Sequence, residues 1–98
     1  MTRMELLLVQ LMEECAEVSQ RASKAIRFGL DEVQPGQDRT NRQRISDEMI
    51  DLYATTRLLE VEGLLLHLEK EDHDRYIKKQ AQIQKFLDYS KELGILKD

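Results

Sequence analysis

Apolar residues recur every three or four positions along residues 4–28, and this spacing constrains the fold more than any other feature of the chain. The recurring residues are Leu7, Leu8, Leu11, Cys15, Val18, Ala22, Ala25 and Ile26. This spacing is typical of an α-helix with one apolar face. Gly29 follows directly, and glycine is a common residue at the end of a helix. The pattern therefore predicts a helix over residues 4–28, with Cys15 as a small core residue rather than a nucleophile.

A second helix is predicted to begin at Thr40, because Thr40 and Gln43 match a capping box. Its apolar residues form two stripes on nearly opposite sides, at about 100° of rotation per residue. One stripe contains Ile45, Met49, Leu52, Thr56 and Leu59, and the other contains Ile50, Ala54, Val61 and Leu68. Gly63 either kinks this helix or breaks its register. A helix that is apolar on both sides is usually central in a bundle.

The third predicted helix spans about residues 73–93, after a connection in which Asp72 or Asp74 is the candidate cap. Gly94 and Ile95 match the pattern of a Schellman stop. The chain is thus predicted to be all-α, with a hairpin over residues 4–62 and a C-terminal helix in a single domain over residues 1–98. Three main helices would form an antiparallel bundle, and oligomerisation into a homodimer or homotetramer would cover the second stripe.

Composition narrows the classes of function. A chain of 98 residues suits one small domain, and its formal net charge of -4 gives no broad basic surface for nucleic acid. Its single cysteine cannot form an intramolecular disulfide, and its first residues lack the long apolar segment of a signal peptide or membrane span. We therefore expect a cytoplasmic protein with neither a membrane nor a nucleic acid among its partners.

Acidic residues on the first two helices are predicted to converge. By rotation, Glu14 and Glu17 lie on one stripe just beside the apolar face of the first helix, whereas Glu13 points away. Glu48 and Asp51 lie on a corresponding stripe of the second helix and at a matching height. Antiparallel pairing brings the two stripes to the same side of the interface, so the four carboxylates should meet.

Crowded carboxylates repel one another unless a cation offsets their charge. Mg²⁺ is the natural candidate, with Mn²⁺ as an alternative, because it prefers oxygen ligands and often bridges carboxylates to phosphates. The spacing of three residues within each pair lets both members approach one ion. A glutamate-rich pattern on one helix also occurs on solvated surfaces, and the matched pair on the partner helix is what favours a metal site.

The residues Glu13-Glu14-Cys15-Ala16-Glu17 and Glu48-Met49-Ile50-Asp51 resemble the EExxE…ExxD signature of the all-α nucleoside triphosphate pyrophosphohydrolases, the MazG-like superfamily. The resemblance covers roughly residues 5–62. It implies a helical oligomer that uses Mg²⁺ to cleave a nucleoside or deoxynucleoside triphosphate into the monophosphate and pyrophosphate. By motif position it implies metal-binding and catalytic roles for Glu14, Glu17, Glu48 and Asp51. The segment between the two motifs is long for the family, and no base-recognition signature is present.

Basic residues near the acidic stripes are candidates for binding the substrate phosphates. Lys24, Arg21 and Arg44 are predicted to contact phosphate, although Arg21 could instead pair with Glu17 at a spacing of four residues. Any of the four carboxylates could act as the general base. Two other functions stay open, a non-catalytic helical interaction module and a nucleotide-binding sensor without turnover.

Four further residues have weaker assignments. His67 and His73 are expected at the surface, because neither completes a di-iron carboxylate motif. Tyr53 and Phe28 flank the predicted site by rotation and could stack on a base, but we expect them to pack in the core.

Overall fold

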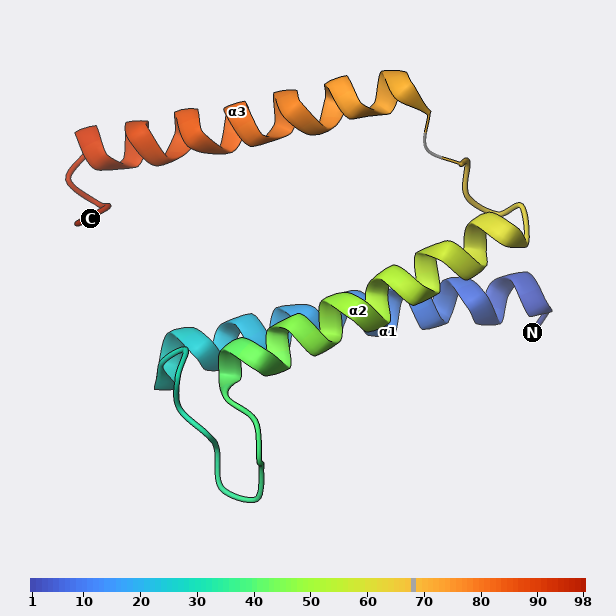
Figure 1. Cartoon of the computed structure of the whole chain (residues 1–98), viewed down its shortest axis with the longest axis horizontal. Coiled ribbons are helices and arrows are strands. Elements are labelled where there is room, and N and C mark those ends of the chain that lie inside the picture. The colour runs from blue at the N-terminus through green and yellow to red at the C-terminus, as the bar shows by residue number, and fades with distance from the viewer. Residues whose placement is uncertain (68) are drawn as a thin grey trace. The chain divides into compact units, whose positions relative to one another are not determined.

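The computed structural model of the protein describes residues 1–67 and 69–98, without the side chains at positions 70 and 71. It contains three α-helices, α1 (Arg3–Phe28), α2 (Asn41–Val61) and α3 (Lys70–Glu92), and no strand among the described residues (Figure 1). The all-α fold class is therefore confirmed. The chain divides into two compact units, Met1–Leu66 and His67–Asp98. A single domain and a bundle completed by oligomerisation stay predictions.

The first unit is a helical hairpin in which α1 and α2 lie side by side and run in opposite directions (Figure 1). Leu59 is fully buried between the two helices, and Ala25 is also buried. Around these residues lie half-buried apolar side chains, namely Leu7, Leu11, Val18, Ile45 and Leu52. Apolar contact along one stripe of each helix therefore holds the hairpin together.

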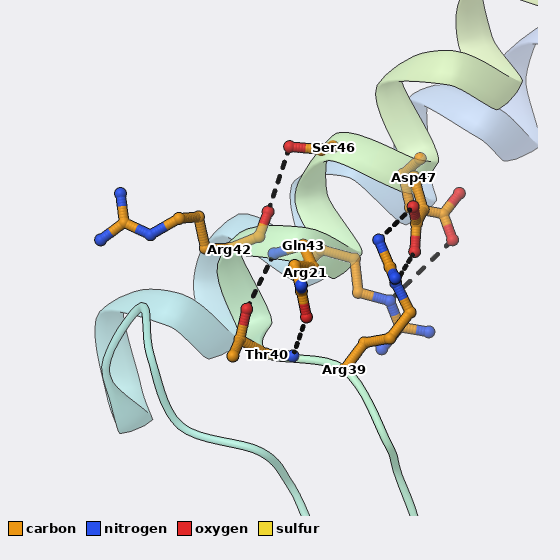
Figure 2. A network of polar contacts seen from close by, with 8 residues as sticks. Arg21, Arg39, Thr40, Arg42, Gln43, Ser46 and Asp47 are labelled. Atoms are coloured by element: carbon orange, nitrogen blue, oxygen red, sulfur yellow. Dashed lines mark hydrogen bonds and ion pairs between the residues drawn. The ribbon is translucent and has the colours of Figure 1, made fainter.

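Side chains fix both helix starts in the hairpin. Thr2 caps α1, because its Oγ1 accepts a hydrogen bond from the Glu5 backbone N–H at 3.1 Å. At α2 the predicted capping box is confirmed, since the Gln43 N–H donates to Thr40 Oγ1 at 3.1 Å and the Thr40 N–H donates to Gln43 Oε1 at 2.9 Å (Figure 2). These bonds satisfy backbone donors that have no partner within the helix.

Asn41 ties the loop between the two helices to the start of α2. Its side chain is almost completely buried, and its Nδ2 donates to the Gly29 carbonyl at 2.8 Å and to Glu32 Oε1 at 3.1 Å. Gly29 ends α1 with a φ of 100°, a conformation that favours glycine. The loop is therefore anchored at the closed end of the hairpin, where α1 ends and α2 begins.

Gly63 ends α2 and does not kink it. The Gly63 N–H donates to the Glu60 carbonyl at 3.0 Å, and the Leu64 N–H donates to the Leu59 carbonyl at 2.9 Å. With a φ of 78° at Gly63, this pair of bonds is a Schellman stop. Leu68, which was predicted on the second stripe, lies outside the described residues.

In the second unit, α3 begins a few residues earlier than predicted. Glu69 is the residue before the helix, and Asp72 Oδ2 accepts a hydrogen bond from its backbone N–H at 2.6 Å. Asp72 and Asp74 therefore lie inside the helix, and the prediction that one of them is the N-terminal cap was wrong. The predicted Schellman stop at Gly94 is confirmed, because the N–H groups of Gly94 and Ile95 donate to Lys91 and Ser90, each at 3.0 Å.

The hairpin leaves several predicted core residues exposed. Cys15, Ile26 and Met49 were assigned to apolar faces, and Tyr53 and Phe28 to the core, but all five are exposed. The reason is geometric, because contact with a single partner helix covers only a narrow stripe, and Cys15 and Ile26 lie roughly 60–100° away from it at about 100° per residue. The second α2 stripe is uncovered as well, with Ile50 65% and Val61 76% exposed.

Candidate metal centre

The stripe where α1 and α2 face each other contains acidic residues as well as apolar ones. We call this stripe the seam, and its members on α1 are Leu7, Leu11, Glu14, Val18, Arg21 and Ala25, all buried or half-buried. Its members on α2 are Asn41, Ile45, Glu48, Leu52, Thr56 and Leu59. The rotational estimate placed Glu14 and Glu48 beside the apolar face. In the structure both lie within the seam itself.

The four predicted carboxylates meet around Glu48. Carboxylate oxygens of Glu14, Glu48 and Asp51 lie within 4.8 Å of one another. Glu17 belongs to the same group, because its carboxyl group lies near enough to Glu48 to raise the pKa of Glu48. Each helix contributes two residues, three positions apart, so the predicted convergence is present. Their role as metal ligands stays a prediction.

The surroundings of Glu48 shift the pKa of its carboxyl group. Burial is the largest cause that raises the pKa of Glu48 above its usual value, followed by the hydrogen bond and charge of Glu17 and then the charges of Asp51 and Glu14. Only 13% of the Glu48 side chain is exposed. All of these effects favour the protonated form of the carboxyl group.

One oxygen of Glu48 lacks a donor. Among the described residues, Oε2 is buried and accepts no hydrogen bond. A hydrogen bond between the carboxyl groups of Glu17 and Glu48 needs a proton on one of them, because two ionised carboxylates have no hydrogen to share. When both are ionised, Glu48 Oε2 has no partner. A buried ionised oxygen in this state is energetically costly, and a cation would offset the cost.

Arg21 is the cation closest to this carboxylate. Its Nε lies 4.0 Å from Glu48 Oε1, across the seam from α1 to α2. Arg21 had been predicted to contact phosphate or to pair with Glu17, so its approach to the other helix was missed. Gln10 was also missed as a partner of the cluster, and its Nε2 donates to Glu14 Oε1 at 2.8 Å. Both residues share a helix stripe with Glu14, which is the sequence signal that could have indicated their roles.

The other predicted phosphate ligands lie on the loop side of the cluster. Lys24 is half-buried, and its side chain makes no hydrogen bond or ion pair within the described part of the chain. Arg44 is half-buried, and its Nη1 donates to Gln34 Oε1 at 3.4 Å, a long and weak bond. The structure does not bring either residue into the carboxylate cluster. Contact between these residues and phosphate stays a prediction.

Two further arginines near the loop are already paired. Arg39 binds Asp47 with two hydrogen bonds of 2.7 and 3.1 Å (Figure 2). Arg42 Nε lies 3.2 Å from Asp31 Oδ1. Such pairs are largely solvated and contribute little to stability. These pairs hold the side chains of Arg39 and Arg42 near the closed end of the hairpin, beside the loop and away from the seam.

The donor set fits a hard divalent cation. The groups are the carboxylates of Glu14, Glu17, Glu48 and Asp51, which come from two helices. One buried oxygen, Glu48 Oε2, lacks a donor among the described residues. These are properties that Mg²⁺ or Mn²⁺ would satisfy. An acidic cluster alone is not evidence of a bound ion, since such clusters also occur without one. The metal therefore stays a prediction that rests on this arrangement.

Comparisons of the chain with family models, curated proteins and solved structures found no match. The resemblance to the MazG-like superfamily therefore depends on the two short acidic motifs alone. No helix in the described residues is long and apolar enough to cross a membrane.

Proposed function

We propose that the protein is a Mg²⁺-dependent nucleoside triphosphate pyrophosphohydrolase that releases the nucleoside monophosphate and pyrophosphate. One observation carries the proposal, namely that the carboxylates of the EExxE and ExxD motifs meet around a half-buried glutamate in the seam. Apolar side chains normally fill a contact between two helices, so acids in the seam replace part of the apolar packing between α1 and α2. A role in binding a cation accounts for that cost.

In this proposal the chain holds the metal between α1 and α2. The residues that would bind it are Glu14, Glu17, Glu48 and Asp51. A divalent ion at such a site lowers the pKa of bound water and offsets negative charge on phosphate oxygens. Gln10 would orient the carboxylate of Glu14 through the hydrogen bond already present.

Substrate phosphates would lie on the loop side of the cluster. Arg21 and Lys24 follow the acidic residues of α1, and Arg44 precedes those of α2, so all three lie toward the same end of the hairpin. Water oxygen forms a bond to the α-phosphorus, the bond from that phosphorus to the bridging oxygen breaks, and pyrophosphate leaves. One of the carboxylates accepts the proton from the water.

A non-catalytic interaction module is the second candidate. It is favoured by the exposed apolar stripe of α2, where Ile50 and Val61 are largely in contact with solvent. The two candidates predict different responses to metal, because a ligand that binds the folded state raises its melting temperature. Mg²⁺ should stabilise the pyrophosphohydrolase and should leave a pure interaction module unchanged.

The proposal is tested by measuring pyrophosphate release from a panel of canonical and modified nucleoside triphosphates with Mg²⁺. We expect Glu48→Gln and Asp51→Asn each to lower the rate at least about 100-fold, because each removes a ligand charge. Glu13→Gln is the matched control, since Glu13 is acidic, adjacent to the cluster in sequence and exposed. This control should keep the wild-type rate.

Other results would redirect the assignment. Full activity in both Glu48→Gln and Asp51→Asn would show that these two residues are not the metal ligands. A melting temperature that rises with Mg²⁺ and nucleotide, without pyrophosphate release, would indicate a nucleotide sensor. No response to metal or nucleotide would favour the interaction module.

A further inference from the structure

Arg21 differs from the other paired arginines of the hairpin in its surroundings. Its side chain is 18% exposed, whereas Arg39, Arg42 and Arg57, which pair with acids elsewhere, are 47%, 60% and 47% exposed. It reaches across the seam to Glu48 rather than outward to solvent. Covering a guanidinium in this way removes hydration from a permanent charge, which is unfavourable unless nearby negative charge offsets it.

The contact between Arg21 and Glu48 is close enough for attraction but too long for a hydrogen bond. The separation of 4.0 Å from Nε to Oε1 exceeds the range of N–H···O bonds. Glu48 Oε2 meanwhile has no donor at all within the described residues. The guanidinium thus offsets part of the charge of the cluster while leaving carboxylate oxygens available to another cation.

We infer that Arg21 is the internal counter-ion of the carboxylate cluster and that it competes with a divalent cation for Glu48. This inference rests on the proposed function, because it assumes that the cluster binds such a cation. Arginine does not lose its proton in proteins, so its charge leaves the cluster only when the side chain moves. Binding of the divalent cation displaces Arg21, whose guanidinium then turns toward the loop side, where Lys24 already lies.

The experiment measures Mg²⁺ affinity by isothermal titration calorimetry on the wild-type protein, Arg21→Met, Arg21→Lys and the control Arg27→Met. We expect Arg21→Met to bind Mg²⁺ about tenfold more tightly, because it removes a competing charge while keeping much of the side-chain length. Arg21→Lys keeps the charge and should stay close to wild type. Arg27 is an exposed α1 residue that lies over the Phe28 ring, so Arg27→Met should have no effect.

A second readout measures the response to Mg²⁺ on the wild-type chain, and a variant serves only to identify one signal. The Nε–H signal of Arg21 in a ¹⁵N spectrum, identified by its loss in Arg21→Lys, should shift when Mg²⁺ is added. The corresponding signal of Arg27 should not shift. An Arg21 signal that ignores saturating Mg²⁺ would overturn the inference.

The outcomes separate this inference from the proposed function. If the wild type binds Mg²⁺ and Arg21→Met binds it equally or more weakly, the counter-ion role is wrong and the metal site stands. If only Arg21→Met binds Mg²⁺, the competition is supported, and the proposed function of the natural chain is not. If neither protein binds Mg²⁺, both ideas fail.

Discussion

Glu48 occupies a place in the seam that an apolar side chain would normally fill. Its neighbours along the α2 stripe are Ile45 and Leu52, so the acid lies between two apolar residues of the seam. A carboxylate there loses hydration and meets the negative charges of Glu17 and other acids. The hairpin is therefore less stable with this residue ionised than with it neutral. Sites that bind ligands commonly carry such a cost.

The raised pKa of Glu48 predicts a specific pH dependence in metal-free protein. Because the folded state holds this proton more tightly than the unfolded state, the stabilisation is complete below the unfolded value of about 4.3 and is lost as pH rises through the folded value. Glu48→Gln cannot ionise and avoids that loss. Its melting temperature should match the wild type near pH 4 and exceed it by several degrees at pH 7.

Differential scanning calorimetry in the presence of a chelator measures this difference across the pH range. Glu13→Gln serves as the control, because Glu13 is exposed and its substitution should give a melting temperature that follows the wild type at every pH. A difference between Glu48→Gln and wild type that stays constant from pH 4 to pH 7 would show that Glu48 does not titrate abnormally.

At the scale of single elements, helix ends were more predictable than helix faces. The capping box at Thr40 and the stop at Gly94 depend on short local patterns, because backbone hydrogen bonding at a helix end involves only neighbouring residues. The stop at Gly63 was not predicted, since Gly63 was expected to kink the helix or break its register. The cap of α3 was missed, because Glu69 is a less common residue there than the aspartates that follow.

Which residues of a helix are buried depends on the elements that pack against it, and the sequence does not show these elements directly. The spacing of apolar residues on α1 suggested a broad face that included Cys15 and Ile26. A single partner helix covers a narrower band, and this band includes Glu14 and Arg21. The convergence of the acids was still predictable, because spacing, height and antiparallel pairing all depend on helix geometry alone. The stripe that Arg21 shares with Glu14 indicated that Arg21 lies near the acids, but not that its side chain crosses the seam to Glu48.

The capping box gives a prediction for the start of α2. Thr40→Ala removes the oxygen that accepts the Gln43 N–H, and we expect it to lower the free energy of unfolding by about 1 kcal/mol. Thr40→Ser keeps the oxygen and should lose much less. Urea denaturation followed by circular dichroism measures both variants. Equal stability of Thr40→Ala and wild type would show that this cap does not contribute to the stability of the fold.

At the scale of the whole molecule, the hairpin has little core of its own. In the described residues, Ala25 and Leu59 are the buried apolar residues, while large apolar residues such as Ile50 and Val61 stay exposed. So small a core contributes little hydrophobic stabilisation, and small domains often need oligomerisation to fold stably. The exposed stripe of α2 is therefore the surface through which we expect a second copy of the chain to associate.

Association through this stripe predicts that stability depends on protein concentration. If folded chains assemble through α2, the melting temperature should rise with concentration, and sedimentation equilibrium should give a mass above that of one chain. Ile50→Glu places a charge on the exposed stripe and should shift the protein toward the monomer, because a charge buried in an apolar interface lacks a partner. Gln20→Glu adds the same charge at an exposed α1 position and should keep the wild-type assembly. A wild-type chain that sediments as a stable monomer, with a melting temperature independent of concentration, would show that the hairpin folds without a second copy.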